Sequence, residues 1–255
     1  MIEYVPLAIA RESKGIRIVT NGLVPSPWSE AVKGVFRLAE LPVIAVRAMP
    51  GDKELSAWTG IDNQPAVFND REPVRTTAHA IVGLVARLAP GKVLPVAPAE
   101  RALAMGLIEL IAGEEGLGWN GRLAMVHAGL SENVGFPPPV AGYLGKRYGY
   151  KAEAVAALVP RVSAQFAVLL AGLEAQRARG FAYFGGAMPS AVDVYVATFL
   201  TPMVELTQAH CPRMMPAMLP AFGAARARFG ERVPGALVEL RERMFAHHLE
   251  FPIAI

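Results

Sequence analysis

The four residues Gln64-Pro65-Ala66-Val67 constrain the fold of this chain most, because of the elements around them. They follow an apolar stretch with strand character, residues 43–46, and a short, partly helical segment, residues 53–58. A strand-like run over 66–68 comes next, then a polar turn and an amphipathic helix from about Thr77. Proline is tolerated at the head of a strand, where only one backbone donor is lost. We expect a cis Gln64-Pro65 bond, which would leave the backbone of Gln64 free to pair with an extended peptide.

The first third of the chain alternates strand and helix patterns. Residues 16–20 read as a strand. Residues 27–39 read as a helix whose apolar side chains share one stripe, namely Trp28, Ala31, Val32, Val35 and Ala39. With the elements around Pro65, this gives a β-α-β unit, an irregular segment and a second pairing of strand and helix. We therefore predict a compact α/β domain over residues 1–89, with residues 1–15 as an N-terminal extension.

The composition changes after residue 89. Residues 90–99 are rich in proline, glycine and small apolar residues, which is typical of a linker. Strand patterns then nearly vanish. Helical patterns cover 100–112, 118–129, 152–179, 191–206, 217–229 and 235–248, with breakers such as Pro137-Pro138-Pro139 between them. Strands followed by helices predict an α+β two-domain protein with an all-helical domain over 100–255.

Composition and charge argue against several classes of protein. The 255 residues are 53% hydrophobic with a mean hydropathy of +0.33, but charged residues interrupt the long apolar stretches, so we expect no membrane-spanning helix. A net charge of +3 without a long Lys/Arg block indicates no nucleic-acid partner. A single cysteine, Cys211, excludes an intrachain disulfide, and no metal-binding motif occurs. Without a signal-peptide pattern, these features predict a cytoplasmic protein.

Ser26-Pro27-Trp28-Ser29 begins the first long helix, and two interpretations stay open. Ser26 is a good N-cap residue, and proline suits the first helical position, where its missing N–H costs nothing. The same geometry suits an anion: unpaired N–H groups and the positive helix end would stabilise a thiolate, to which a serine hydroxyl could donate. Ser29 is the second candidate for that hydroxyl.

A capping-box pattern occurs at Pro189-Ser190-Ala191-Val192-Asp193, after Tyr183-Phe184-Gly185-Gly186. By itself the box only stabilises the start of a helix. The whole string from Tyr183 to Tyr195, however, resembles the buried capping-box helix in the second domain of glutathione S-transferases. Together with Ser26-Pro27-Trp28 and Gln64-Pro65-Ala66-Val67, each in its expected place, the resemblance covers residues 16–230.

This resemblance implies a thioredoxin-like α/β domain packed on an all-helical domain, and a homodimer. In the family, a serine, tyrosine or cysteine near the first helix orients the sulfur of glutathione, which makes Ser26 the expected catalytic residue. Gln64, followed by Pro65, would pair with the cysteinyl backbone of glutathione, and Thr76 or Thr77 would hold the γ-glutamyl carboxylate. The implied function is that of a glutathione S-transferase, which conjugates the glutathione thiol to an apolar small-molecule electrophile.

One departure from the family leaves a second function open. Arg75-Thr76 stand where the family has an acidic residue followed by serine, so the partner of the ligand ammonium must be another group, such as Asp70 or Glu72. The alternative is a non-catalytic protein that keeps the fold as a binding or interaction module. Four further residues lie on helices that face the cleft in this family: Arg101, Trp119, Arg122 and His127. An apolar wall for the electrophilic substrate would come from Trp119 and Met125, although packing between helices is the more common role of such residues.

Overall fold

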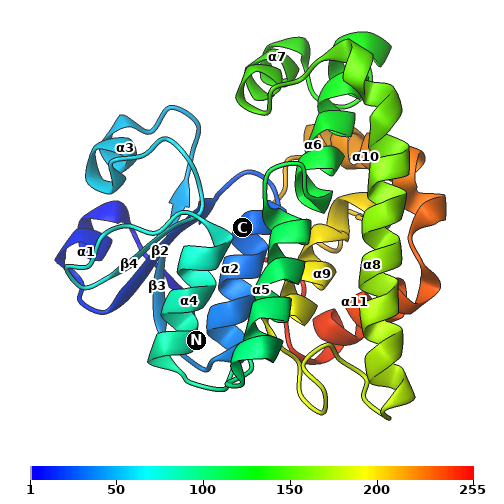
Figure 1. Ribbon diagram of the computed structural model, residues 1–255. Helices are drawn as coiled ribbons and strands as arrows, with labels where there is room; N and C mark the ends of the chain where they lie inside the picture. The colour runs from blue at the N-terminus through cyan, green and yellow to red at the C-terminus, as the bar shows by residue number, and fades with distance from the viewer. Residues whose placement is uncertain (1) are drawn as a thin grey trace.

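The computed structural model describes residues 2–255 and places all four of their strands in one sheet (Figure 1). The strands are β1 (Ile2–Tyr4), β2 (Ile16–Asn21), β3 (Val43–Ala48) and β4 (Ala66–Asn69), in the spatial order β1-β3-β2-β4. β1 and β2 run parallel to β3, whereas β4 is antiparallel to β2 and sets Ala66 opposite Val19. The predicted N-terminal extension thus supplies an edge strand of the sheet.

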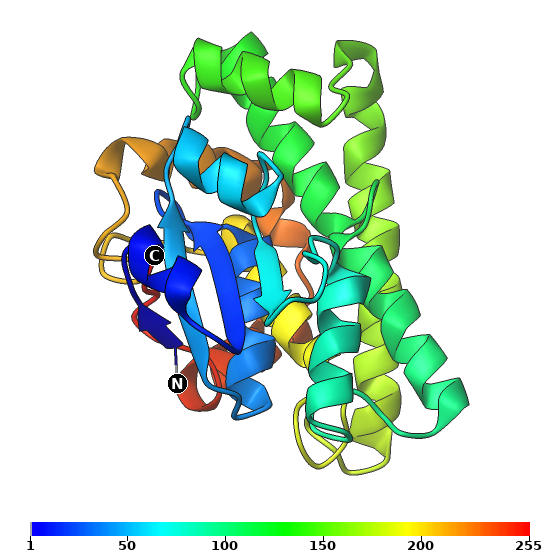
Figure 2. The same cartoon turned by 90° about the vertical axis from the view of Figure 1, so that its left-hand side faces the viewer.

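Helices cover both faces of this sheet (Figures 1 and 2). α2 (Pro27–Leu38) and α4 (Ala78–Leu88) lie on the face toward the helical half, while α1 (Leu7–Glu12) and α3 (Lys53–Thr59) lie on the other. Neighbouring strand residues alternate between the faces. Ile18 therefore belongs to the main core with α2, and Val19 packs in a second cluster with Leu55 of α3.

The rest of the chain is helical. Its α-helices are α5 (Pro98–Ala112), α6 (Leu117–His127), α7 (Pro138–Arg147), α8 (Leu158–Ala178), α9 (Ala191–Phe199), α10 (Leu219–Phe229) and α11 (Gly235–His247). A π-helical turn, Ala128–Glu132, continues α6, and 3-10 turns occur at Ala152–Ala157, Thr201–Met203, Pro216–Met218 and Gly230–Arg232. Within residues 2–255 no strand follows Asn69, which confirms the predicted α+β order.

α7 corrects one expectation. The three prolines interpreted as a break between helices instead begin this helix, with Pro137 at the N-cap and Pro138 and Pro139 in the first turn. The N–H groups of a first helical turn have no intrahelical acceptor, so proline loses nothing there. α7 also lines a cavity of about 860 Å³.

The longest helical stretch, Ala152–Ala178, has the length and hydropathy that a membrane-spanning helix needs, with Arg161 and Glu174 inside it. One third of its most apolar window is buried in the fold. Its buried apolar side chains all belong to the main core: Leu158, Val162, Phe166, Leu169 and Leu173. A core helix of a globular domain meets the same criteria of length and hydropathy, so this stretch is weak evidence of a membrane span.

The predicted capping box is present at the start of α9. The fully buried carboxylate of Asp193 accepts hydrogen bonds from the N–H (2.7 Å) and hydroxyl (2.9 Å) of Ser190. It also accepts from the N–H groups of Phe184 (2.8 Å) and Gly185 (3.2 Å). Burial raises the pKa of Asp193 to about 6, although these four donors act to lower it. Asp193 therefore ties the glycine-containing loop before α9 to the helix itself.

α9 also joins the two halves of the molecule. Every residue of α9 is buried, and the helix packs against α2, α5 and α11. A Cβ atom added to Gly34 of α2 would lie 2.5 Å from Val194, so only glycine permits this close approach. Trp28 of α2 packs edge-on against Phe199 at 4.9 Å between ring centroids and donates its Nε1–H to Ala112 at 3.0 Å.

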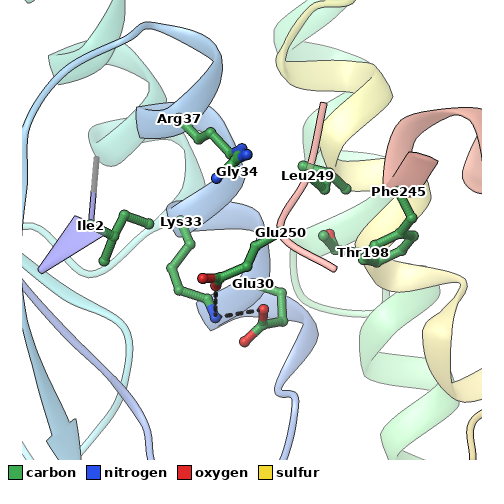
Figure 3. Close-up of a pocket in the computed structure, with 9 residues that line it drawn as sticks. All are labelled: Ile2, Glu30, Lys33, Gly34, Arg37, Thr198, Phe245, Leu249 and Glu250. Carbon is green, nitrogen blue, oxygen red and sulfur yellow. Dashed lines mark ion pairs between the residues drawn. The ribbon is translucent and has the colours of Figure 1, made fainter. Parts of the chain in front are cut away.

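The segment after α11 returns to the α/β half. Arg47 donates to the carbonyl of Ile255 (2.6 Å), and the Tyr4 hydroxyl donates to that of Ala254 (3.2 Å). Lys33, 3% exposed, also bonds Ala254 and forms ion pairs with Glu30 (2.8 Å) and Glu250 (3.6 Å), as Figure 3 shows. Although burial acts to lower it, the Glu30 carboxylate holds the pKa of Lys33 above its ordinary value. Lys33 is therefore a buried cation that is fully paired.

Candidate functional site

A cavity of about 860 Å³ lies between the α/β half and the helical half. Its α/β wall comes from the β2–α2 connection and from residues 48–64, which include α3. Its helical wall comes from α6, Phe136, α7, Tyr148 and Met218, so α3 and α7 face each other across it (Figure 1). A second cavity, beside Lys33 and Glu250 (Figure 3), has only about 10 Å³, which leaves room for a water molecule at most. The large cavity is therefore the candidate ligand site.

Ser26 lines this cavity at the N-cap position of α2. It is 8% exposed, and its side chain makes no capping hydrogen bond. Pro27 occupies the first turn, as expected. Ser29, the second candidate, is completely buried and accepts a hydrogen bond from the N–H of Asn21 at 3.0 Å. Of the two serines, Ser26 is the one that a ligand in the cavity can reach, while Ser29 holds the loop in place.

Asn21, which was not expected from the sequence to have a role here, shapes the connection between β2 and α2. Its Oδ1 accepts from the N–H groups of Leu23 and Val24, both at 2.9 Å. Asparagine commonly closes turns in this way, and the sequence signal was its place at the end of the strand expected over residues 16–20. This turn sets Leu23, Val24 and Ser26 along the cavity wall.

The Gln64-Pro65 peptide is cis, as predicted. Gln64 lines the cavity, whereas Pro65 is buried at the head of β4 and does not. The N–H of Gln64 donates to the Oδ1 of Asn63 at 2.9 Å, and both residues border the same cavity. The structure thus brings together Ser26 and Gln64 from separate elements of the α/β half.

Thr76 and Thr77 are not among the residues that line the cavity. Thr77 is the N-cap of α4, and its Oγ1 accepts from the N–H of Ala80 at 3.2 Å. Their expected contact with a γ-glutamyl carboxylate stays a prediction. It would require the ligand to extend past Gln64, beyond the cavity itself.

The charged residues near Thr76 are engaged with one another. Arg75 pairs with Glu72 at 2.5 Å, and Arg87 pairs with the same carboxylate at 2.6 Å. Hydrogen bonds from Arg87, Asn69 and Arg75 lower the pKa of Glu72 to about 2. Asp70 accepts from the N–H of Gly15 at 2.7 Å. Glu72 and Asp70, the acids considered for a ligand ammonium, therefore already have partners.

Two other acidic residues line the cavity and were not expected from the sequence. Asp52 caps α3 by accepting from the N–H of Leu55 at 2.9 Å, and Asp62 is an exposed residue close to Gln64 in the chain. Asp52 could have been found as an aspartate at a helix start. Asp62 lies in an irregular segment whose sequence pattern carries no such signal.

On the helical wall, Arg122 is the one of the five further candidates that lines the cavity. Its guanidinium lies 5.6 Å from the ring centroid of Phe136 and 6.0 Å from that of Tyr148. Trp119 packs behind Tyr148 at 4.6 Å between centroids. The others lie elsewhere: Met125 is in the core, Arg101 is exposed on α5, and His127 contacts the Tyr150 hydroxyl at 2.8 Å. For Trp119 and Met125, packing between helices is the role that the structure supports.

No protein-family profile and no curated protein sequence matches the chain. Solved structures do match. The chain is 15% identical to a glutathione transferase family member from Pseudomonas fluorescens with two glutathione bound, over 92% of this chain and 89% of that one, with a TM-score of 0.61. For a glutathione S-transferase from Methylobacterium radiotolerans in complex with glutathione sulfonate, the values are 16% identity, 94% and 97% coverage, and a TM-score of 0.55. A glutathione S-transferase from Methylobacillus flagellatus with glutathione bound is 12% identical to the chain, over 88% of this chain and 98% of that one, with a TM-score of 0.54.

These similarities extend over both halves of the molecule. This protein therefore has the glutathione transferase fold, which confirms the predicted combination of a thioredoxin-like α/β unit with a helical one.

Proposed function

We propose that this protein binds glutathione in the large cavity and activates its thiol for attack on an apolar electrophile. One observation carries the proposal. Ser26, at the start of α2, keeps a side chain that makes no capping bond and lines an 860 Å³ cavity together with Gln64 at the cis proline. The solved structures of the same fold that contain glutathione support this choice of ligand.

In this proposal the start of α2 stabilises the sulfur as a thiolate. N–H groups in the first turn of a helix lack intrahelical acceptors, and the positive end of the helix dipole lies there. A hydrogen bond from the Ser26 hydroxyl adds to this stabilisation, so the thiol loses its proton to solvent near neutral pH. The sulfur then forms a bond to an electrophilic carbon, and the leaving group departs with its electron pair.

The tripeptide itself would lie along the α/β wall. The backbone of Gln64 pairs with the cysteinyl residue, and Thr76 and Thr77 lie on the side where the γ-glutamyl carboxylate extends. Glu72 and Asp70 are engaged elsewhere, and Asp52 is used as the cap of α3, so we assign the ligand ammonium to Asp62, an exposed carboxylate that lines the cavity close to Gln64. The apolar substrate would occupy the helical wall, beside Val140 and Tyr143 of α7.

A second function has its own support. The γ-glutamyl side differs from the family pattern, because Arg75 and Glu72 form an ion pair there and Thr77 is used as a helix cap. A binding or interaction module without turnover would tolerate these changes. Such a protein keeps the cavity but not the chemistry at Ser26.

Calorimetric titration of the protein with glutathione tests the proposal. The proposal predicts saturable binding that is weakened in an Asp62→Asn variant. The control is Glu153→Gln, which removes one exposed negative charge away from the cavity and should leave the affinity unchanged. Binding combined with turnover of a chlorodinitrobenzene supports the transferase. Binding without turnover contradicts the proposed activation of the thiol at Ser26. The absence of saturable binding at millimolar glutathione contradicts the proposal as a whole and favours the module.

A further inference from the structure

The helical wall of the large cavity carries positive charge without a matching negative charge. Among the described residues of the helical half that line it, the charged ones are Arg122 of α6 and Arg147 of α7, and none is acidic. The acids that line the cavity, Asp52 and Asp62, both belong to the α/β wall. The remainder of the helical wall is apolar or aromatic, for example Val140, Leu144 and Tyr148.

Arg122 has unused hydrogen-bonding capacity in this wall. Its Nε is buried and has no hydrogen-bond partner among the described residues. A buried donor without an acceptor is costly and is uncommon in folded proteins, so such a group calls for a partner. Arg147, by comparison, is exposed and donates to the Tyr143 hydroxyl at 3.1 Å. Arg122 is therefore the stronger candidate for contact with a ligand.

Aromatic rings hold the Arg122 guanidinium in place. Phe136 and Tyr148 lie within 5.6 and 6.0 Å of it, and Tyr148 is itself packed against Trp119 and Trp28. Arginine stacks on aromatic faces while the edge of its planar fork stays available for two parallel hydrogen bonds to a carboxylate. An arginine positioned in this way loses little side-chain freedom when it binds an anion.

We propose that Arg122 recognises a carboxylate on the second substrate, so that the preferred electrophiles are apolar or aromatic molecules with one anionic group. The apolar body lies against Val140 and Tyr143 of α7, and the carboxylate lies at Arg122. This inference rests on the proposed function for the reaction, but the anion site can be tested without glutathione.

The test compares two ligands that differ mainly in charge, para-nitrobenzoate and methyl para-nitrobenzoate, by calorimetry on the full chain. A hydrogen-bonded charge pair predicts that the wild type binds the carboxylate about tenfold or more tighter than the ester. Arg122→Met keeps the apolar stem and removes the charge, so this preference is lost. Arg122→Lys keeps the charge without the fork and retains part of the preference.

Arg179→Met is the matched control, because Arg179 also lies over an aromatic ring, Phe181 at 5.3 Å, but is exposed and does not line the cavity. It should keep the full preference. Equal affinities of the wild type for acid and ester, absence of binding of either, or a preference that survives Arg122→Met would overturn the inference.

Glutathione titrations of the same variants separate this inference from the proposed function. A charge preference in a protein that does not bind glutathione refutes only the transferase proposal. Glutathione binding without a charge preference refutes only the anion site. A large loss of glutathione affinity in Arg122→Met, with no benzoate preference in the wild type, would show that Arg122 serves glutathione instead.

Discussion

Replacement of Asp193 by alanine probes the interaction that ties α9 to the loop before it. The substitution removes the acceptor for the N–H groups of Phe184, Gly185 and Ser190 and for the Ser190 hydroxyl. An unsatisfied buried donor costs about 1–3 kcal/mol. The Ser190 N–H is buried and bears the full cost, whereas the bonds of Phe184 and Gly185 are partly buried, so water can replace some of what is lost.

A second effect acts in the opposite direction. Burial raises the pKa of Asp193 to about 6, so the carboxylate is less favourable in the folded protein than in the unfolded chain. Alanine removes that cost. A rise from 3.8 to about 6 corresponds to about 3 kcal/mol. Two fully buried donors of Ser190 at about 2 kcal/mol each, and two partly buried ones at about half of that, lose about 5–7 kcal/mol in all. The balance is an expected loss of about 2–4 kcal/mol in the free energy of unfolding. Ser190→Ala should cost about 1 kcal/mol, as for a typical N-cap.

Guanidinium denaturation of the single and double variants measures these values, with two spectroscopic probes to check that unfolding is two-state. The double variant should lose less than the sum of the single losses, because both residues belong to one hydrogen-bonded unit. Asp52→Ala is the control, since Asp52 caps α3 through a single N–H. The reasoning fails if Asp193→Ala costs no more than Asp52→Ala, or if the two losses at the capping box add fully.

Three further outcomes follow from the structure. Ser26→Ala should lower kcat/KM with a chlorodinitrobenzene by a factor that corresponds to about 1–2 kcal/mol. Ser131→Ala, away from the cavity, should leave kcat/KM unchanged. Equal rates for both variants would exclude Ser26 from the chemistry. Lys33→Met should destabilise the fold by about 3–5 kcal/mol, because Glu30 is then buried without its partner. The further change Glu30→Gln should restore part of the lost stability, as measured by denaturation curves. The wild type should be more stable than Glu72→Gln at a pH above about 4.5, and this difference in stability should disappear as the pH falls through about 2. The reason is that the pKa of Glu72 is lowered from 4.5 to about 2 in the folded protein. A stability difference that does not depend on pH would show that these contacts do not act through charge.

Local patterns were sufficient to predict most of the fold. The cis proline, the alternation of strand and helix before residue 89 and the capping box at Ser190 and Asp193 each depend on a few neighbouring residues, and each is found as expected. α7 was missed because proline both ends and begins helices, and the sequence alone did not decide between these uses. The pairing of β1 with β3 was missed because it joins residues about forty positions apart, which leaves no periodic signal.

The candidate site was less predictable than the fold. Ser26 and Gln64 could be named because each lies at a recognisable element boundary, a helix start and a strand start. Asn21 and Asp62 were not expected, and Arg122 was one of five candidates among which the sequence did not choose; all three reach the same cavity from separate segments. Their shared place is a result of tertiary packing, in particular of how α6 and α7 stand opposite the α/β half. For Arg122 the informative fact is an unpaired Nε, which only the folded structure shows.

The central claim is that the start of α2, with Ser26, stabilises the glutathione thiolate. The ionisation of bound glutathione tests it most directly, because ultraviolet difference absorbance reports the thiolate as the pH is changed. The account predicts that the pKa of the bound thiol lies well below that of free glutathione, and that Ser26→Ala moves it back toward the free value. A bound thiol that titrates like free glutathione, or a shift that Ser26→Ala leaves untouched, would contradict the claim.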